Sequence, residues 1–313
     1  LSTIDFKEKL TVIEKNTFMN CIRLKTVRLP ESLLSIEQEC FHFCRFLQSI
    51  VIPPKVEGIT YSMFNDCNNL KTVRMNDRIS YIHSYAFYQC CNLESIKIPK
   101  NCSVVSDNAF AACHQMKKIV LQEGLTVLET NVFNSCKHLD SIILPNSLQS
   151  IKTSCFQYCY SLNSIVIPEN VVNIDNSAFE FCIGLKSVVI HNVTLMGKNV
   201  FNRCFLLSSC LFLGLFNPIY SDPIFQETNV VAVDVLYSYK SDNFCGHPVN
   251  FLSEEFQYNE TLLLPATDPF TSSNTFTQIN SFEQTHSIEY TNSKESNLFE
   301  TVKPLSNNYV YSN

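Results

Sequence analysis

The sequence contains no tryptophan, only six glycines in 313 residues, and no apolar run of 18 or more residues. Neither of the glycine-rich phosphate-binding motifs, G-x-x-x-x-G-K-[ST] and G-x-G-x-x-G, occurs, so nucleotide-dependent chemistry is not indicated. A membrane-spanning helix needs about 20 consecutive apolar residues, so membrane anchoring is not visible in this chain.

An excess of basic charge is also missing. The formal net charge is −6, and the stretch beyond Phe251 accounts for it with eight acidic and two basic residues. The rest of the chain is balanced, with 21 acidic and 21 basic residues. A protein that binds nucleic acid generally shows a basic footprint, so nucleic acid is not an expected partner.

What the chain does have is a repeat of 23 residues, shortened once to 22. The repeat is marked by nine phenylalanines: Phe18, Phe41, Phe64, Phe87, Phe110, Phe133, Phe156, Phe179 and Phe201. A cysteine follows each of them by three residues (Cys21 to Cys204), leucine or methionine follows by six, and an apolar residue precedes by five (Ile13 to Met196). A fixed period of this length predicts a solenoid, in which stacked repeats share one core.

Each repeat divides into a strand, a stop, a second short strand and a turn. In Leu162-x-x-Ile165-x-Ile167 the alternation predicts a strand with Ile165 and Ile167 facing inward, and Pro168 ends it. The spacing of three in Phe-x-x-Cys-x-x-Leu predicts a single helical or 3₁₀ turn. The expected fold is therefore mostly β, with parallel strands stacked along the array and short helical or 3₁₀ turns.

The pattern predicts three regions along the chain. Residues 1–213 form the solenoid, which begins in mid-repeat because Leu1, Ile4 and Phe6 share the register of Leu24, Val27 and Leu29. Residues 214–250 have no period but contain an apolar run, which is expected of a C-terminal cap. Residues 251–313 form an acidic tail rich in Ser, Thr and Asn, which we expect to be disordered.

The unit resembles the BspA-type leucine-rich repeat, a 23-residue class found in surface proteins of bacteria and protists. Residues 165–182 follow that pattern through Ile165, Ile167, Pro168, Phe179 and Cys182. The resemblance implies a curved solenoid with a parallel sheet on its concave face and no catalytic activity. It also implies a role in adhesion or protein binding at the cell surface, with host or extracellular-matrix proteins as partners.

The cysteines are better explained as core residues than as a metal site or a redox chain. Equivalent positions in neighbouring coils have parallel side chains about 5 Å apart, which is longer than the Cβ separation a disulfide needs. Zinc requires clustered ligands, and the pairs Cys40/Cys44 and Cys155/Cys159 lie five coils apart without histidines in register. We therefore predict no metal and no cofactor.

The histidines do not support an active site. They occupy mostly different positions of the repeat, so no Ser-His-Asp or Cys-His arrangement is apparent. We predict that the protein is not an enzyme, that it has no catalytic residues and that it has no small-molecule substrate.

The outward position of the long strand is the better functional candidate. Its residues are basic at first and aliphatic later: Arg28, Val51, Arg74, Lys97, Val120, Ile143, Val166, Val189 and Leu211. One interpretation is structural, because β-branched side chains suit strands. The other is a partner-binding surface, in which proteins dock on an exposed aliphatic file from Val120 to Leu211 while Arg28, Arg74 and Lys97 attract an acidic region.

Three N-x-[ST] sequons are candidate glycosylation sites, at Asn101, Asn192 and Asn259. The function that follows from the resemblance is a non-catalytic protein-interaction module at the cell surface or outside the cell. An intracellular scaffold with reduced cysteines is the alternative, and the state of the thiols distinguishes the two.

Overall fold

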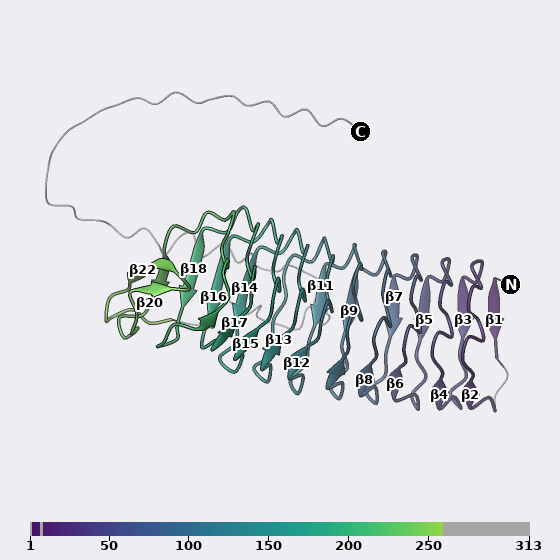
Figure 1. Ribbon diagram of the computed structural model, residues 1–313. Helices are drawn as coiled ribbons and strands as arrows, with labels where there is room; N and C mark the ends of the chain where they lie inside the picture. Colours follow the sequence, from purple (N-terminus) through teal and green to yellow (C-terminus); the bar gives the residue numbers. More distant parts are fainter. Residues whose placement is uncertain (1, 7–8, 259–313) are drawn as a thin grey trace, which may run out of the picture. The chain divides into compact units, whose positions relative to one another are not determined.

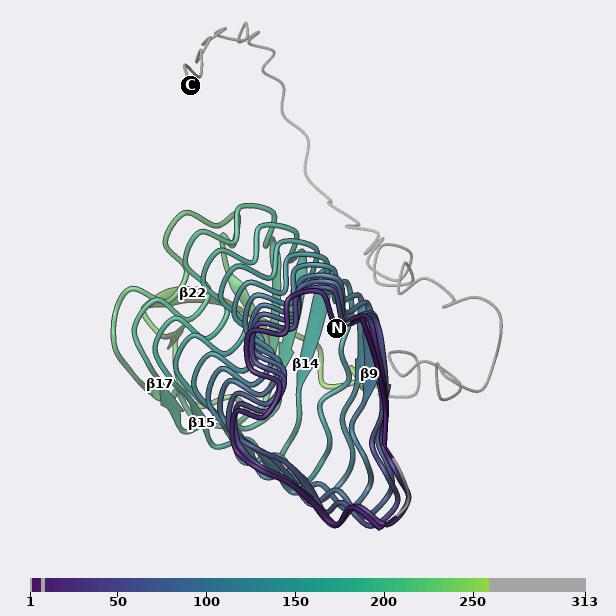
Figure 2. The same ribbon diagram turned by 90° about the vertical axis from the view of Figure 1, so that its right-hand side faces the viewer.

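The computed structural model describes residues 2–6 and 9–258, which belong to one compact unit. The chain winds into coils that stack along one axis (Figure 1). In the view near that axis, equivalent segments of successive coils lie over one another (Figure 2). Every regular element within these residues is a β-strand, and the strands run along two sides of each coil while turns form the third.

The longer strands form one side, here called the long-strand sheet. They pair in parallel within three ladders, β1-β3-β5-β7, β9-β11 and β14-β16-β18-β20-β22. Their bounds are β1 (Thr3–Asp5), β3 (Thr26–Arg28), β5 (Ser49–Val51), β7 (Thr72–Arg74), β9 (Ser95–Lys97), β11 (Lys118–Val120), β14 (Ser164–Ile167), β16 (Ser187–Ile190), β18 (Ser209–Phe212), β20 (Val233–Val235) and β22 (His247–Phe251). A parallel bridge between Val120 and Ile143 continues the ladder beyond β11.

Two-residue strands form the second side. They are β2 (Val12–Ile13), β4 (Ser35–Ile36), β6 (Gly58–Ile59), β8 (Tyr81–Ile82), β10 (Val104–Val105), β12 (Val127–Leu128), β13 (Ser150–Ile151), β15 (Asn173–Ile174), β17 (Leu195–Met196) and β19 (Ile219–Tyr220). Pairing is again parallel and shifts by one repeat, as in Ser150 with Asn173 and Ile151 with Ile174. The short-strand side therefore keeps the same register as the long-strand sheet.

The turn side differs from the expected helical or 3₁₀ turn. Cys136 N donates to Phe133 O (3.1 Å) and Leu139 N to Cys136 O (3.0 Å), which are the i→i+3 bonds of such turns. However, Asn131 and Ser135, two residues before and after Phe133, have φ of 59° and 61°. A left-handed residue cannot continue a right-handed helix, so separate turns replace it.

These left-handed residues have a structural purpose. They direct the amides of Asn131, Phe133 and Ser135 toward the next coil, where they donate to the carbonyls of Thr153, Cys155 and Gln157 at 2.8–3.0 Å. Both positions are left-handed in all nine repeats, and none of the residues there is glycine. The cost of the conformation, of order 1–3 kcal/mol per residue, is offset by bonds between coils.

The phenylalanines form one continuous file through the core. Consecutive rings from Phe18 to Phe201 are stacked, with centroids between 5.1 Å and 5.8 Å apart. All but Phe18 are fully buried. Strands within a sheet lie about 4.8 Å apart. Neighbouring coils are therefore spaced more widely at the ring file than strands usually are within a sheet.

The predicted cap region, residues 214–250, continues the stack. Phe225 adds a tenth ring, 5.5 Å from Phe201, while β19 and β20 extend the two strand sides. Thr228 takes the cysteine position and donates to Phe225 O at 2.8 Å. The antiparallel pair of β21 (Asn243–Phe244) with β22 ends the long-strand sheet. The division into solenoid, cap and tail stays a prediction, and residues 259–313 of the expected tail lie outside the described residues.

Within residues 2–6 and 9–258, no helix has the length and apolar character needed to cross a bilayer.

Removing one ring from the middle of the file should destabilise the whole unit. Phe133→Ala removes a fully buried side chain between Phe110 and Phe156 and leaves a cavity, so we expect a loss of about 3–5 kcal/mol in the free energy of unfolding. Chemical denaturation measures it, and Phe205→Ala, at a ring that is 46% exposed, is the control. Equal, small losses for both variants would mean that the ring file is not the core.

Candidate functional site

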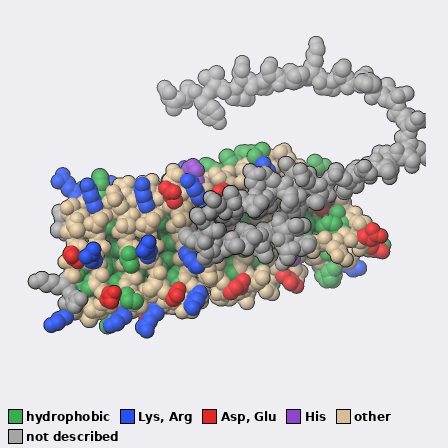
Figure 3. All heavy atoms as spheres, turned by 180° about the vertical axis from the view of Figure 1, so that it is seen from behind, with side chains coloured by type: hydrophobic (Ala, Val, Ile, Leu, Met, Phe, Trp, Pro, Cys, Tyr) green, Lys and Arg blue, Asp and Glu red, His purple; other side chains and the backbone are tan. Residues whose placement is uncertain are grey.

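The outward positions of the long-strand sheet are exposed at its N-terminal end. Alternation along each strand turns one side chain out and the next in, so Arg28, Arg74 and Lys97 lie on the surface while Val27 and Ile96 are buried. From the side opposite to Figure 1, Lys and Arg side chains are most frequent toward the N-terminal end of the molecule (Figure 3).

The aliphatic half of the same file is only partly exposed. Ile143 is 43% exposed, and Val120 and Val166 are half-buried. Val189 and Leu211 are buried, at 3% and 5% exposure, which differs from the exposed file that alternation predicts. Val189 lies in register between Val166 and Leu211, so large side chains pack on it from both neighbouring strands. The accessible aliphatic surface is therefore Val120, Ile143 and Val166.

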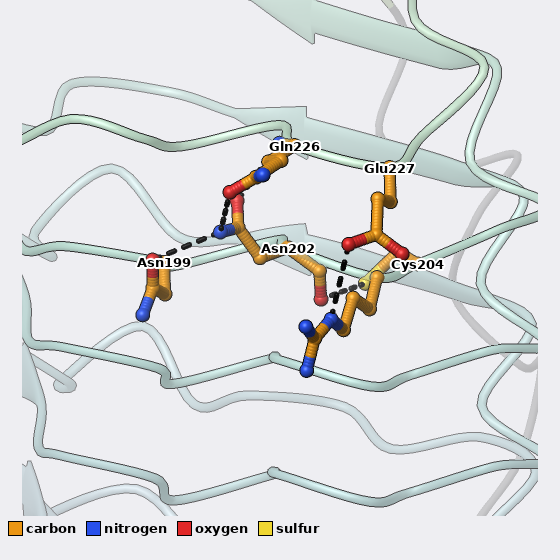
Figure 4. A network of polar contacts seen from close by, with 6 residues as sticks. Asn199, Asn202, Cys204, Gln226 and Glu227 are labelled. Atoms are coloured by element: carbon orange, nitrogen blue, oxygen red, sulfur yellow. Dashed lines mark hydrogen bonds and ion pairs between the residues drawn. The ribbon is translucent and has the colours of Figure 1, made fainter.

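A network of polar side chains on the turn side connects the coil of Phe201 with the coil of Phe225 (Figure 4). Asn202 is buried; its Nδ2 donates to Asn199 Oδ1 at 2.8 Å, and its Oδ1 accepts from Gln226 N at 2.8 Å. Beside it, Arg203 Nε donates to Glu227 Oε1 at 3.2 Å. Each group has a partner within the network, so its evident role is to satisfy buried amides and hold the coils together.

The cysteine file supplies hydrogen bonds to the core. In eight repeats the thiol donates to the carbonyl of the phenylalanine one coil earlier, as Cys136 Sγ does to Phe110 O at 3.3 Å. All fifteen cysteines are free thiols. Within residues 2–6 and 9–258, no three His, Cys, Asp or Glu side chains are grouped as a metal ion would require. The expectation that the file fills a narrow core position agrees with this geometry.

Burial keeps these thiols protonated. Loss of solvation raises the pKa of Cys136 and of Cys44 to about 12, and that of Cys67 well above its usual range. The thiolate, which is the nucleophile and the metal ligand, is therefore rare at neutral pH. Only Cys21 and Cys91 are half-buried among the fifteen.

Within residues 2–6 and 9–258 the histidines lie in different coils, and His114 and His138 are neighbours in consecutive coils. Burial lowers the pKa of His42, and it also lowers the pKa of His114, where Lys137 and His138 contribute. Both rings are therefore neutral at pH 7. His191 Nδ1 lies 2.8 Å from Ile167 O and its ring meets that of Tyr258, and His138 Nδ1 lies 2.7 Å from His114 O. These contacts are with backbone and rings, not with a nucleophile.

The sequons differ in accessibility. Asn101 and Asn192 are exposed, and Asn101 Nδ2 donates to Asp77 O at 2.7 Å. Asn259 lies outside the described residues. Glycosylation of the two exposed sites stays a prediction.

Comparison with known proteins identifies the repeat. Residues 1–117 and 80–208 match the family described as "BspA type Leucine rich repeat region", in six copies. The chain belongs to the BspA-type leucine-rich repeat family. No curated protein has a sequence that matches the chain.

Solved structures of leucine-rich repeat proteins share the fold. A leucine-rich repeat protein from Bacteroides ovatus is 22% identical, with a TM-score of 0.58 over 81% of each chain. A leucine-rich cell surface protein from Faecalibacterium prausnitzii is 21% identical, with a TM-score of 0.50 over 82% of this chain and 74% of that one. At these identities the likeness concerns the fold alone. BspA-type repeats are generally non-catalytic scaffolds that bind proteins, and this fold suits that use.

The thiols should react in two classes. At pH 8, we expect the half-buried Cys21 and Cys91 to react with a thiol reagent in the folded protein, because the other thirteen are buried. Burial also raises the pKa of Cys91, so the difference between the two classes comes from access of the reagent. Time-resolved thiol titration measures this, and titration in denaturant gives the full fifteen. Rapid reaction of most thiols in the folded state would contradict the buried file.

Proposed function

We propose that the chain is a non-catalytic protein-interaction module that works in adhesion at the cell surface or after secretion. The partners are proteins, including host or extracellular-matrix proteins, and the contact surface is the outer side of the long-strand sheet. No catalytic residue, cofactor or small-molecule substrate takes part in this proposal.

The observation that carries the proposal is the accessible aliphatic surface at the centre of the stack. Val120 and Ile143 are bridged in register, and Val166 occupies the next coil in the same file. Ile143 has 43% of its surface exposed, whereas other coils have a charged residue at the equivalent position. Apolar side chains gathered in one place on a sheet are a common feature of protein interfaces.

The cations nearer the N-terminus favour partners with acidic residues. Arg28, Arg74 and Lys97 share the file with Val120 and Ile143 and are exposed. Charge of one sign beside an apolar patch favours partners whose own patch is bordered by acidic residues, and it raises their association rate at low salt. Val189 and Leu211 contribute little to a first contact, because both are buried.

A second candidate is an intracellular scaffold, which the free thiols favour. All fifteen cysteines are unpaired, and Cys245 is buried with its sulfur 3.7 Å from Met196 Sδ. Disulfides are usual in exported proteins and rare in the cytosol. Glycans on Asn101 or Asn192 in protein from its native source support export, whereas unmodified asparagines with fifteen free thiols support the scaffold.

Introducing charge into the aliphatic surface should abolish partner binding without unfolding the protein. The probe is an extracellular-matrix protein that the wild type binds, immobilised on the sensor. We expect Ile143→Glu combined with Val166→Glu to weaken this binding at least tenfold, because two carboxylates would then be desolvated at the interface. Biolayer interferometry with the full chain measures the affinity, and circular dichroism checks the fold.

The matched control places the same charges on the short-strand side. Val104→Glu and Val172→Glu change residues that are 45% and 47% exposed there, so binding should stay within about twofold of wild type. Binding that survives the Ile143 and Val166 changes, or that falls equally in the control, would refute this docking surface.

A further inference from the structure

The basic residues of the long-strand sheet are arranged at a regular interval. Lys25 and Arg28 lie just before and at the end of β3, and Lys71 and Arg74 occupy the same positions at β7. Lys117, which precedes β11, repeats the first position once more. These three strands belong to every second coil, so the cations recur at about 10 Å along the stack. We call these five residues the basic strip.

Four members of the strip form no ion pair with a described residue. Lys25, Arg28, Lys71 and Arg74 are exposed, and none of them forms an ion pair within the part of the chain that the structure describes. Lys117 does pair with Glu94, at 4.0 Å. Asp5 lies next to Arg28 in register without an ion pair. Exposed cations without an ion pair remain available to an anionic ligand.

Hydroxyl groups run between the two rows of cations. Thr26, Ser49 and Thr72 are in register across β3, β5 and β7, and all three are exposed. They present short polar side chains that donate and accept hydrogen bonds. The strip is therefore part of the surface of the long-strand sheet. A row of hydroxyls runs along its centre, and in every second coil cations flank this row.

We propose that the basic strip binds a linear sulfated polysaccharide whose chain lies along the stack. Lysine and arginine bind sulfate groups through charge-assisted hydrogen bonds, and the hydroxyls of Thr26, Ser49 and Thr72 match those of sugars. Such a chain offers anions at intervals, as the strip offers cations. This site shares Arg28 and Arg74 with the surface of the proposed function, but it does not use the aliphatic residues Val120, Ile143 and Val166.

Two other polyanions fit the strip less well. Nucleic acid is generally bound by proteins with an overall basic domain, whereas basic and acidic residues balance in the chain up to Phe251. A disordered acidic peptide would have to be ordered over several coils, and that loss of conformational entropy reduces its affinity. A polysaccharide with a stiffer backbone loses less conformational entropy on binding than such a peptide.

The test uses the full chain and a fluorescent heparin oligosaccharide, with affinity measured by fluorescence anisotropy at about 0.15 M NaCl. We expect Arg28→Ser combined with Arg74→Ser to weaken binding at least tenfold and to reduce its dependence on salt, because fewer counterions are released. Chemically desulfated oligosaccharide should bind at least tenfold more weakly than the sulfated form. Thermal unfolding of each variant confirms that the fold is kept.

The control removes the same amount of charge elsewhere. Lys198→Ser and Lys240→Ser change two exposed lysines outside the strip, so the affinity should remain within about twofold of wild type. The proposal is overturned if the wild type does not bind, if the control loses as much affinity as the strip variant, or if desulfated sugar binds equally well. Tighter binding of a polyglutamate peptide than of heparin overturns it in favour of an acidic protein.

Discussion

The structure depends on contacts between equivalent residues of neighbouring coils. A single coil has one in-register phenylalanine, one in-register cysteine and a few buried aliphatic side chains, which cannot form a core by themselves. In the stack each ring lies between two others, and each in-register thiol from Cys44 onward donates to the phenylalanine carbonyl of the coil before it. Function is then confined to the outer positions, because the inner ones are fixed by their neighbours.

The periodic part of this fold is readable from sequence because each position of the repeat has one environment. Phe133, Cys136 and Leu139 are fully buried, as their positions predict, and the same holds for nearly all their equivalents. Parallel pairing shifted by one repeat follows from the same period, and Ser164 does pair with Ser187. Nine consistent copies make each of these inferences far stronger than one segment could.

The structure differs from the sequence-based predictions at features that the repeat period does not determine. A spacing of three residues fits a helical turn and also fits two turns separated by a left-handed residue, and only the hydrogen bonds to the next coil select the second. Phe225 is missed because it follows Phe201 by 24 residues and has Thr228 in place of cysteine. Val189 and Leu211 are predicted as outward-facing, but exposure depends on neighbours that a strand pattern does not specify.

The candidate sites, too, could be predicted only in part from the sequence. The sequence indicates which residues share the outward file, and the structure places Arg28, Arg74 and Ile143 on the surface there. Which described cations form no ion pair is a property of side-chain positions, and so is the end of the accessible aliphatic surface at Val166. Periodicity identifies the surface, and only the geometry shows which part of it is available.

The forward hydrogen bonds of the turns give the stack a polarity. The amides of Asn199, Phe201 and Arg203 reach the carbonyls of Pro223, Ile224 and Gln226, so each coil receives bonds on one side and donates them on the other. Pro223 has no amide hydrogen, and it stands where the earlier coils place a left-handed donor. Another coil added after this one would lack that bond, so one of the three hydrogen bonds that hold earlier coils together on the turn side would be missing there.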